Sequence, residues 1–347
     1  MLAGLGVSTA TFNPADCDSS YALLERPNAE WPVGATDTFA ASTREKKTRK
    51  WRKMVEPWWD HELVSVPSTH GQRNITIALH RWRARHAVTL GGGRRPALVL
   101  WVHGGGMVLP SGRLGDPQIG ILRRLGPQLL IAAASHPTNT RYRTHPGFHM
   151  TEVEYALAPR YPCPAAAEDV INSLDWVLSH AAALGGDPER VAVMGESAGG
   201  NLAAALHAAR RRLPVRFAGV FYPMVENAVA SPSYSLFSQG PGLRKCAMEF
   251  FWRAYCPTAE ACSTWRCTPL SGDALAAAAT GHPPTLVISC SSDVLRDDGV
   301  RYWRALVAAG VAADHQQVEG SHGCTHAANS STRDRYLDKL RVALGLD

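Results

Sequence analysis

The sequence predicts an α/β protein built on a mostly parallel, doubly wound sheet with helices on both faces. Short apolar runs alternate along the chain with longer stretches of helical pattern, and several of these runs end in glycine-rich or polar turns. The chain has 347 residues, 45% of them hydrophobic, and can therefore bury a large core. In such a sheet, functional residues gather in the loops beyond the carboxyl ends of the strands.

The predicted strands differ in their patterns. Residues 74–80 alternate between apolar and polar side chains, as a half-exposed strand does, whereas residues 97–102 are apolar throughout, as in a strand covered on both faces. A helix is expected at roughly 117–134 and a strand near 151–157. The alternation then continues with a helix at roughly 165–183, a strand at 191–194, a helix at 202–209, strands at 217–222 and 285–290, a helix at roughly 297–309, a strand at 313–318 and a closing helix near 332–344.

Two segments fit this alternation poorly. Residues 1–65 are the least regular part, and tryptophans at positions 31, 51, 58 and 59 interleave with charges, which suggests one or two helices lying on the body of the protein. An irregular, aromatic-rich insertion follows the strand at 217–222. The aromatic side chains of these segments suggest an apolar pocket or simply packing; they are Trp58, Trp59, Phe237, Phe250, Phe251 and Trp252.

Charge and hydropathy argue against several classes of protein. The net charge of +6 is spread along the chain, and its one dense patch, at 43–53, has the pattern of a solvated helix face, so we expect no nucleic-acid partner. No apolar run approaches the roughly 20 residues that a bilayer-spanning helix needs. The first 20 residues lack the basic start of a secretory signal. The sequence therefore predicts a soluble cytoplasmic protein, with a cleaved organellar peptide as the alternative.

The eight cysteines contain no CxxC pair, and the spacing of Cys256, Cys262 and Cys267 matches no zinc pattern. We expect reduced, mostly buried thiols. The three histidines of the stretch 136–149 fit a polar loop better than a metal centre.

A serine stands on a turn of the kind that nucleophiles occupy. The strand at 191–194 breaks off into Gly195-Glu196-Ser197-Ala198-Gly199, which has the pattern G-x-S-x-G and continues into a helix of small residues. Such a turn projects the Ser197 hydroxyl above the sheet, at the positive end of the helix. The pattern also occurs as an ordinary glycine-rich turn, so the remaining motifs have to decide.

The other parts of an acyl-transfer site follow in the expected order. His103-Gly104-Gly105-Gly106 comes directly after a strand, where its backbone N–H groups can stabilise a developing oxyanion. Asp293 lies just beyond the strand at 285–290, whereas Asp297 and Asp298 fall in the first turn of the next helix, where they complement its dipole. His322 lies in a glycine-flanked loop after the last strand, which gives the order Ser, Asp, His.

With these motifs the chain resembles the hormone-sensitive-lipase family of α/β-hydrolases, which includes bacterial carboxylesterases, arylacetamide deacetylase-like enzymes and plant carboxylesterases. The resemblance covers roughly residues 70–345. It rests on HGGG at 103–106, GESAGGN at 195–201, VEYALAPRYPCPAAAEDV at 153–170, SSDVLRDDGVRYWRALVAAGV at 291–311 and EGSHG at 319–323.

The resemblance implies an α/β-hydrolase domain at 70–345 and a helical lid formed by residues 1–65 and an insertion at about 224–268. It also implies that Ser197 is the nucleophile, His322 the general base and acid, and Asp293 its orienting partner. No metal or organic cofactor is implied. The oxyanion hole would use the backbone N–H groups of Gly105, Gly106 and Ala198, with Gly104 in reserve.

Three departures from the family pattern precede the serine turn. Ala156 stands where the family has an arginine, Glu154 stands where it has an aspartate, and the stretch 136–149 is longer than the usual connection. The long stretch affects the alignment before Tyr155 and leaves the catalytic motifs untouched.

The sequence thus predicts a serine carboxylesterase that acts on a small-molecule ester of short-to-medium acyl or aryl type through an acyl-enzyme. An amidase, deacetylase or formamidase is the nearest alternative because the same groups cleave activated amides. A ligand-binding protein similar to the plant gibberellin receptors is a further alternative, although the catalytic histidine is replaced in those receptors and His322 is present here. A homodimer is a possible assembly.

Overall fold

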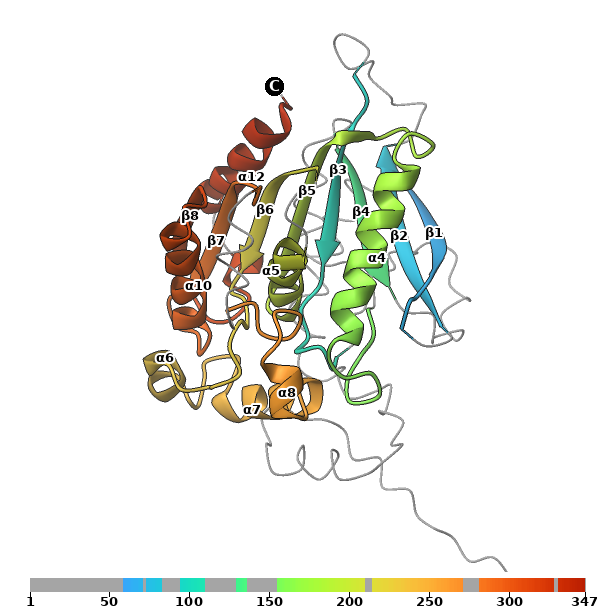
Figure 1. Ribbon diagram of the computed structural model, residues 1–347. Coiled ribbons are helices and arrows are strands. Elements are labelled where there is room, and N and C mark those ends of the chain that lie inside the picture. The colour runs from blue at the N-terminus through green and yellow to red at the C-terminus, as the bar shows by residue number, and fades with distance from the viewer. Residues whose placement is uncertain are drawn as a thin grey trace, which may run out of the picture.

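The computed structural model describes residues 59–70, 73–82, 94–109, 129–135, 155–209, 214–270, 281–327 and 330–346. These residues form one central sheet with helices on both of its faces and a group of short helices across one edge (Figure 1). The residues predicted for most of the N-terminal segment and for the 136–149 stretch lie outside the described part of the chain.

The sheet has eight strands in the order β1-β2-β4-β3-β5-β6-β7-β8. The edge strand β1 pairs antiparallel with β2, and β2 pairs antiparallel with β4, whereas all remaining pairs are parallel. The strands are β1 (Trp59–Pro67), β2 (Asn74–Trp82), β3 (Ala97–Val102), β4 (Leu129–Ser135), β5 (Asp187–Glu196), β6 (Val215–Phe221), β7 (Thr285–Cys290) and β8 (Ala313–Val318).

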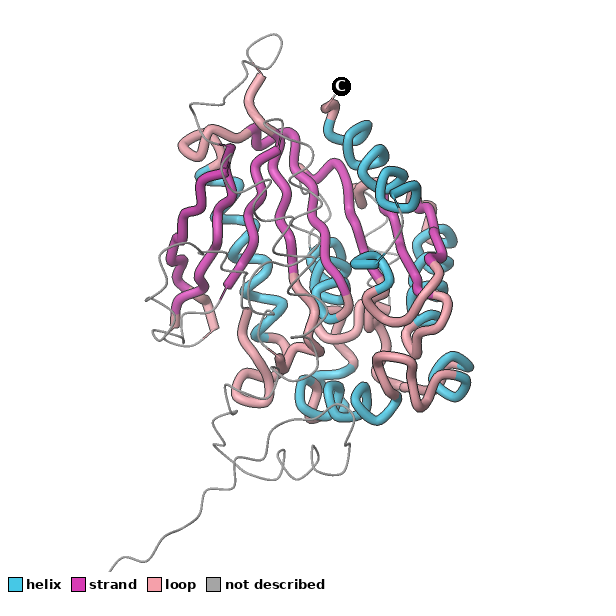
Figure 2. Tube along the Cα trace, turned by 180° about the vertical axis from the view of Figure 1, so that it is seen from behind, coloured by secondary structure: helices cyan, strands magenta, loops and turns pink. Residues whose placement is uncertain are grey.

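The long helices divide between the two faces of the sheet. Helices α4 (Ala165–His180), α5 (Ala198–Ala209) and α10 (Arg296–Ala308) cover one face, while α12 (Ser330–Leu344) crosses the other, as the view from behind shows (Figure 2). Strand β6 illustrates the division: Val220 belongs to a cluster with side chains of α5 and α10, whereas the ring of the next residue, Phe221, packs 5.5 Å from the ring of Tyr336 on α12.

Short helices lie beyond the carboxyl ends of the parallel strands. They are α6 (Pro232–Leu236), α7 (Lys245–Tyr255), α8 (Ala259–Cys262) and α11 (Cys324–Ala327). The first three belong to the insertion that follows β6 and line the lower edge of the molecule in Figure 1. Asn201 of α5 holds both ends of this insertion, because its side-chain amide donates to the carbonyl oxygens of Met224 at 2.7 Å and Cys267 at 2.8 Å.

Three expectations about secondary structure are wrong. The end of the helix expected at 117–134 is strand β4, which finds backbone partners on β2 and on β3. The alanines of this segment favour a helix in isolation, but pairing on both edges outweighs so weak a preference. Residues 155–157 form no strand, and the amide of Ala156 instead donates to the Asp169 carboxylate at 2.7 Å. Trp59 begins strand β1 and does not lie in a helix.

The expectation of reduced thiols is also wrong for part of the chain. Cys256 is bonded to Cys262 at the end of α7, and Cys290 at the end of β7 is bonded to Cys324 at the start of α11. Cys163 and Cys267 are free and buried. Sequence spacing could not indicate the second bridge, because its two cysteines are 34 positions apart and meet only through the fold.

Candidate active site

The turn between β5 and α5 requires both of its glycines. A Cβ atom on Gly195 would overlap the carbonyl oxygen of Gly199, and one on Gly199 would overlap the carbonyl oxygens of Val102 and His103. Ser197, between them, has a φ of 54°, a left-handed conformation that a residue with a side chain rarely adopts. Its amide donates to the carbonyl oxygen of Phe221 at 2.9 Å, which fixes the turn to the neighbouring strand β6.

The structure brings together Ser197, Asp293 and His322, which come from three different loops. Nε2 of His322 lies 2.9 Å from Ser197 Oγ, and Nδ1 of His322 lies 2.7 Å from Oδ2 of Asp293. The Asp293 side chain is fully buried, and its other oxygen accepts the amide of Leu295 at 3.1 Å. Because Nδ1 donates to a carboxylate, Nε2 is left to accept a proton from the serine hydroxyl.

The glycine-rich turn after β3 lies against the serine. A Cβ atom on Gly104 would be 3.1 Å from Ser197 Cβ, which is closer than almost all such contacts. Gly105 has a φ of 109° and Gly106 a φ of 64°. Within the described residues, the backbone N–H groups of Gly105, Gly106 and Ala198 donate to no other group. They are therefore available to an oxygen atom bound beside Ser197.

His103 and Tyr155 hold the backbone of the glycine turn in place, a role that the sequence motifs did not indicate. Their rings stack at 4.5 Å, Nδ1 of His103 donates to the carbonyl oxygen of Gly104 at 2.5 Å, and the Tyr155 hydroxyl donates to the carbonyl oxygens of His103 and Gly104. Burial lowers the pKa of His103 to about 4, although its hydrogen bond to Gly104 and the nearby charge of Glu196 act in the opposite direction. His103 is therefore neutral near neutral pH and serves as a rigid donor.

Glu196 and its hydrogen-bond partners form a second polar group at the site, which the sequence motifs did not indicate. Glu196, directly before the serine, is hydrogen-bonded by Tyr222 and His326. The glutamate was visible within G-x-S-x-G, but its partners lie 26 and 130 positions further along the chain, so no local pattern could indicate them.

The segment at position 156 is held against α4 through a residue from the β1–β2 hairpin. Asp169 of α4 is fully buried and accepts the amide of Ala156, the hydroxyl of Ser68 and the guanidinium of Arg73. Arg73 thereby neutralises this carboxylate, and the segment around Tyr155 is held against α4.

Helix α7 of the insertion packs against the glycine turn. Phe250, Phe251 and Trp252 of α7 are buried in the main core, and the Phe251 ring fills the space beside Gly106. The side chain of Trp59 and all of Trp58 lie outside what the structure describes.

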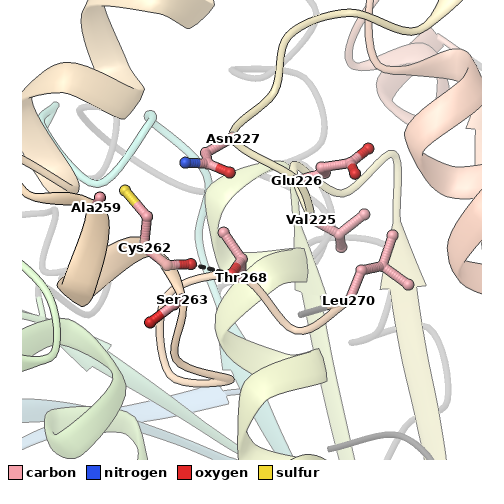
Figure 3. Close-up of a pocket in the computed structure, with 8 residues that line it drawn as sticks. All are labelled: Val225, Glu226, Asn227, Ala259, Cys262, Ser263, Thr268 and Leu270. Atoms are coloured by element: carbon pink, nitrogen blue, oxygen red, sulfur yellow. Dashed lines mark hydrogen bonds between the residues drawn. The ribbon is translucent and has the colours of Figure 1, made fainter. Parts of the chain in front are cut away.

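A hollow with a volume of about 320 Å³ lies between helix α8 and the segment that follows β6 (Figure 3). A neighbouring hollow of about 330 Å³ shares Asn227 and Cys262 with it. Neither is lined by Ser197, Asp293 or His322. The residues that line the first are Val225, Glu226, Asn227, Ala259, Cys262, Ser263, Thr268 and Leu270.

Two further features bear on the chemistry. In the described part of the chain, no cluster of three or more His, Cys, Asp or Glu side chains is placed to hold a metal ion. Among the helices that the structure describes, none combines the length and the hydropathy that a membrane-spanning segment requires.

Comparison with known proteins supports the fold. A family profile described as α/β hydrolase fold matches residues 129–327. The carboxylesterase NlhH of Mycobacterium tuberculosis is 31% identical over 220 residues, which cover 62% of this chain and 62% of that protein. The chain thus spans less than two thirds of that relative's length.

Two further proteins are similar to this chain at slightly lower sequence identity. The arylacetamide deacetylase of Oryctolagus cuniculus is 29% identical over 288 residues, which cover 65% of this chain and 67% of that protein. Among solved structures, a thermophilic and thermostable carboxylesterase cloned from a metagenomic library is 28% identical and superposes with a TM-score of 0.64, covering 87% of this chain and 92% of that one. The fold, the motifs and these matches agree, and the chain belongs to the α/β-hydrolase family, as a member similar to hormone-sensitive lipase.

Proposed function

We propose that the protein is a serine carboxylesterase that hydrolyses small carboxylic esters through an acyl-enzyme. The observation that carries this proposal is the continuous chain of hydrogen bonds from Ser197 through His322 to Asp293, with distances of 2.9 and 2.7 Å. The similarity to carboxylesterases over most of the described fold supports the same reaction.

In the first half of the reaction, Ser197 Oγ attacks the ester carbonyl carbon while Nε2 of His322 takes the hydroxyl proton. The carbonyl oxygen becomes an oxyanion, which the N–H groups of Gly105, Gly106 and Ala198 stabilise. His322 then gives its proton to the leaving alcohol. Asp293 keeps the imidazole in the required tautomer and stabilises the imidazolium.

In the second half, water enters and attacks the acyl-enzyme. His322 takes a proton from this water, a second oxyanion forms in the same place, and the bond to Ser197 Oγ breaks as His322 returns the proton to the serine. The carboxylic acid leaves and the resting site is restored. All proton transfers use one imidazole, and no metal or organic cofactor takes part.

Amide hydrolysis is the second candidate, because the chain is similar to an arylacetamide deacetylase. The same residues would act, with an amine as the leaving group. A binding-only role, as in a hormone receptor, is disfavoured because the His322 imidazole lies within hydrogen-bond distance of the serine.

The deciding experiment uses purified protein and p-nitrophenyl esters from acetate to dodecanoate, with an aryl acetamide beside them. We expect ester turnover in the parent and near-complete loss in Ser197→Ala at unchanged thermal stability. Turnover of the acetamide alone would replace the ester proposal by the amide one. Substantial activity in Ser197→Ala would remove the nucleophile assignment.

We further propose that the insertion helices α6, α7 and α8 act as part of a lid, because they lie across the carboxyl edge of the sheet (Figure 1). A homodimer and a cytoplasmic location stay predictions of the sequence. The disulfides Cys256–Cys262 and Cys290–Cys324 speak against a cytoplasmic location, because such bonds are rare in reducing compartments.

A further inference from the structure

A second pair of carboxylate and imidazole side chains lies beneath the Ser197 turn. Glu196 accepts a hydrogen bond from Nε2 of His326 at 2.7 Å and another, to the same oxygen, from the Tyr222 hydroxyl at 2.6 Å. The side chains of Glu196 and His326 are only 13% and 17% exposed, so water screens the pair weakly.

This pair contacts two parts of the proposed machinery. The other carboxylate oxygen of Glu196 points to the glycine turn, where a Cβ atom on Gly104 would lie 3.6 Å from it. The Tyr222 ring meets the His322 ring edge-on, with 5.0 Å between their centroids. The Tyr222 hydroxyl also lies 3.4 Å from Nε2 of His326. Tyr222 thus bridges the two imidazoles and the carboxylate.

Glu196 keeps its negative charge at neutral and mildly acidic pH. Burial raises the pKa of Glu196, but the charge and hydrogen bond of His326, the hydroxyl of Tyr222 and the charge of His322 outweigh burial and lower it to about 2. Among the described residues, His103 is a further titratable neighbour of Glu196, and burial keeps it neutral. Because an interaction between two charges is mutual, a carboxylate that is stabilised by protonated His322 also stabilises that protonated form.

We propose that Glu196 is a positioning residue whose carboxylate stabilises the imidazolium of His322, and that His326 holds this carboxylate in place and offsets its charge. The proposal rests on the ester hydrolysis proposed above, in which His322 becomes an imidazolium in each half of the reaction. It assigns a task to His326, which lies outside the predicted triad.

Two single substitutions should act in opposite directions. Glu196→Gln removes the negative charge and leaves His326 beside His322, so the imidazolium is less stable: we expect kcat to fall about tenfold with little change in KM. The acidic limb of the kcat/KM profile should move to lower pH by about half a unit or more. His326→Gln keeps a donor for Glu196 but removes the offsetting charge, so the limb should move to higher pH.

A matched control removes a carboxylate from the same strand. Glu189 is exposed near the amino end of β5, far from the serine turn, and Glu189→Gln should leave kcat and the profile unchanged. Circular dichroism and thermal unfolding of each variant separate a positioning role from a structural one, because lost stability alone does not move a pH limb.

The measurement should also be made without a substrate that turns over. The rate at which a fluorophosphonate modifies Ser197 depends on His322 as base, since the Oγ–P bond forms, fluoride leaves and His322 takes the proton. Its pH profile should shift in both variants as described, even if ester hydrolysis were not the natural reaction. Limbs that stay in place, or that move in the same direction in both variants, would overturn the proposal.

Discussion

The ring of Phe251 occupies the space where a side chain on Gly106 would have to lie. Helix α7 of the insertion therefore rests directly on the glycine turn that supplies the proposed oxyanion donors. Because Gly106 also has a φ of 64°, both its backbone conformation and its lack of a Cβ atom are required here. The position of the insertion and the geometry of the turn are thus coupled through one van der Waals contact.

This contact predicts that Gly106→Ala lowers kcat at least about tenfold, because misplacing one oxyanion donor costs that much or more. The double variant Gly106→Ala/Phe251→Ala should regain part of the loss, since the clash is gone and only the backbone strain remains. Gly185→Ala is the control: Gly185 also has a positive φ, of 79°, but a Cβ atom there would meet nothing within 4 Å. Esterase kinetics on all four proteins would test this, and a Gly106→Ala variant as active as Gly185→Ala would refute it.

The two aspartates near the end of β7 should differ sharply in their effect on turnover. Asp293→Asn places an amide opposite Nδ1 of His322 and favours the wrong tautomer, so we expect kcat to fall by about three to four orders of magnitude. Asp297 instead accepts the amide of Ser233 at 2.8 Å and pairs with Arg296. Asp297→Asn should therefore cost less than about tenfold. A larger loss in Asp297→Asn than in Asp293→Asn would show that the acid has been assigned to the wrong residue.

The sequence could predict those features of the fold and of the site whose pattern lies within a short stretch of residues. The loops that carry Ser197, Asp293 and His322 could be located because each follows a strand with a clear apolar pattern, and parallel strands bring their carboxyl ends to one edge. The sequence did not indicate strand β4, because alanine is not enriched in strands. These residues form a strand because they pair with β2 and β3.

Side-chain partners far apart in the sequence could not be predicted. His326 lies beyond the loop of His322 and belongs to no motif, yet the short helix α11 turns it back to Glu196. Arg73 has no motif of its own and acquires its role only when the β1–β2 hairpin meets α4. Such contacts depend on packing in three dimensions, which periodicity and spacing do not encode.

The bond between Cys290 and Cys324 ties the loop of Asp293 to the loop of His322, since one cysteine lies three residues before the aspartate and the other two residues after the histidine. Replacing both cysteines by alanine should lower the free energy of unfolding by about 2–4 kcal/mol, as expected for a loop of this length. We also expect kcat to fall more than KM rises. Urea unfolding and kinetics of the double variant would measure both effects, and unchanged kcat would mean that the bond stabilises the fold without positioning the triad.

The buried carboxyl group of Asp298 should give the protein an unusual dependence of its stability on pH. It is buried, and burial raises its pKa well above the usual value, aided by the charges of Glu226 and Asp293 and opposed by the Tyr234 hydroxyl and Arg301. The folded protein therefore retains a proton that the unfolded chain releases. Above the unfolded pKa of about 4, this difference costs stability, and the cost grows as the pH rises until the folded pKa is reached.

Asp298→Asn removes that cost and can keep the contact with Tyr234, so its stability relative to the parent should increase as the pH rises above about 4. Asp297→Asn should show the opposite trend. Burial alone would raise the pKa of Asp297, but Arg296 and the Ser233 amide lower it, so its contribution to stability is present at neutral pH and lost as the pH falls through the folded pKa. Urea unfolding of both variants, above about pH 4 for Asp298→Asn and below about pH 4 for Asp297→Asn, would measure the two slopes, and slopes of the same sign would contradict the assigned protonation states.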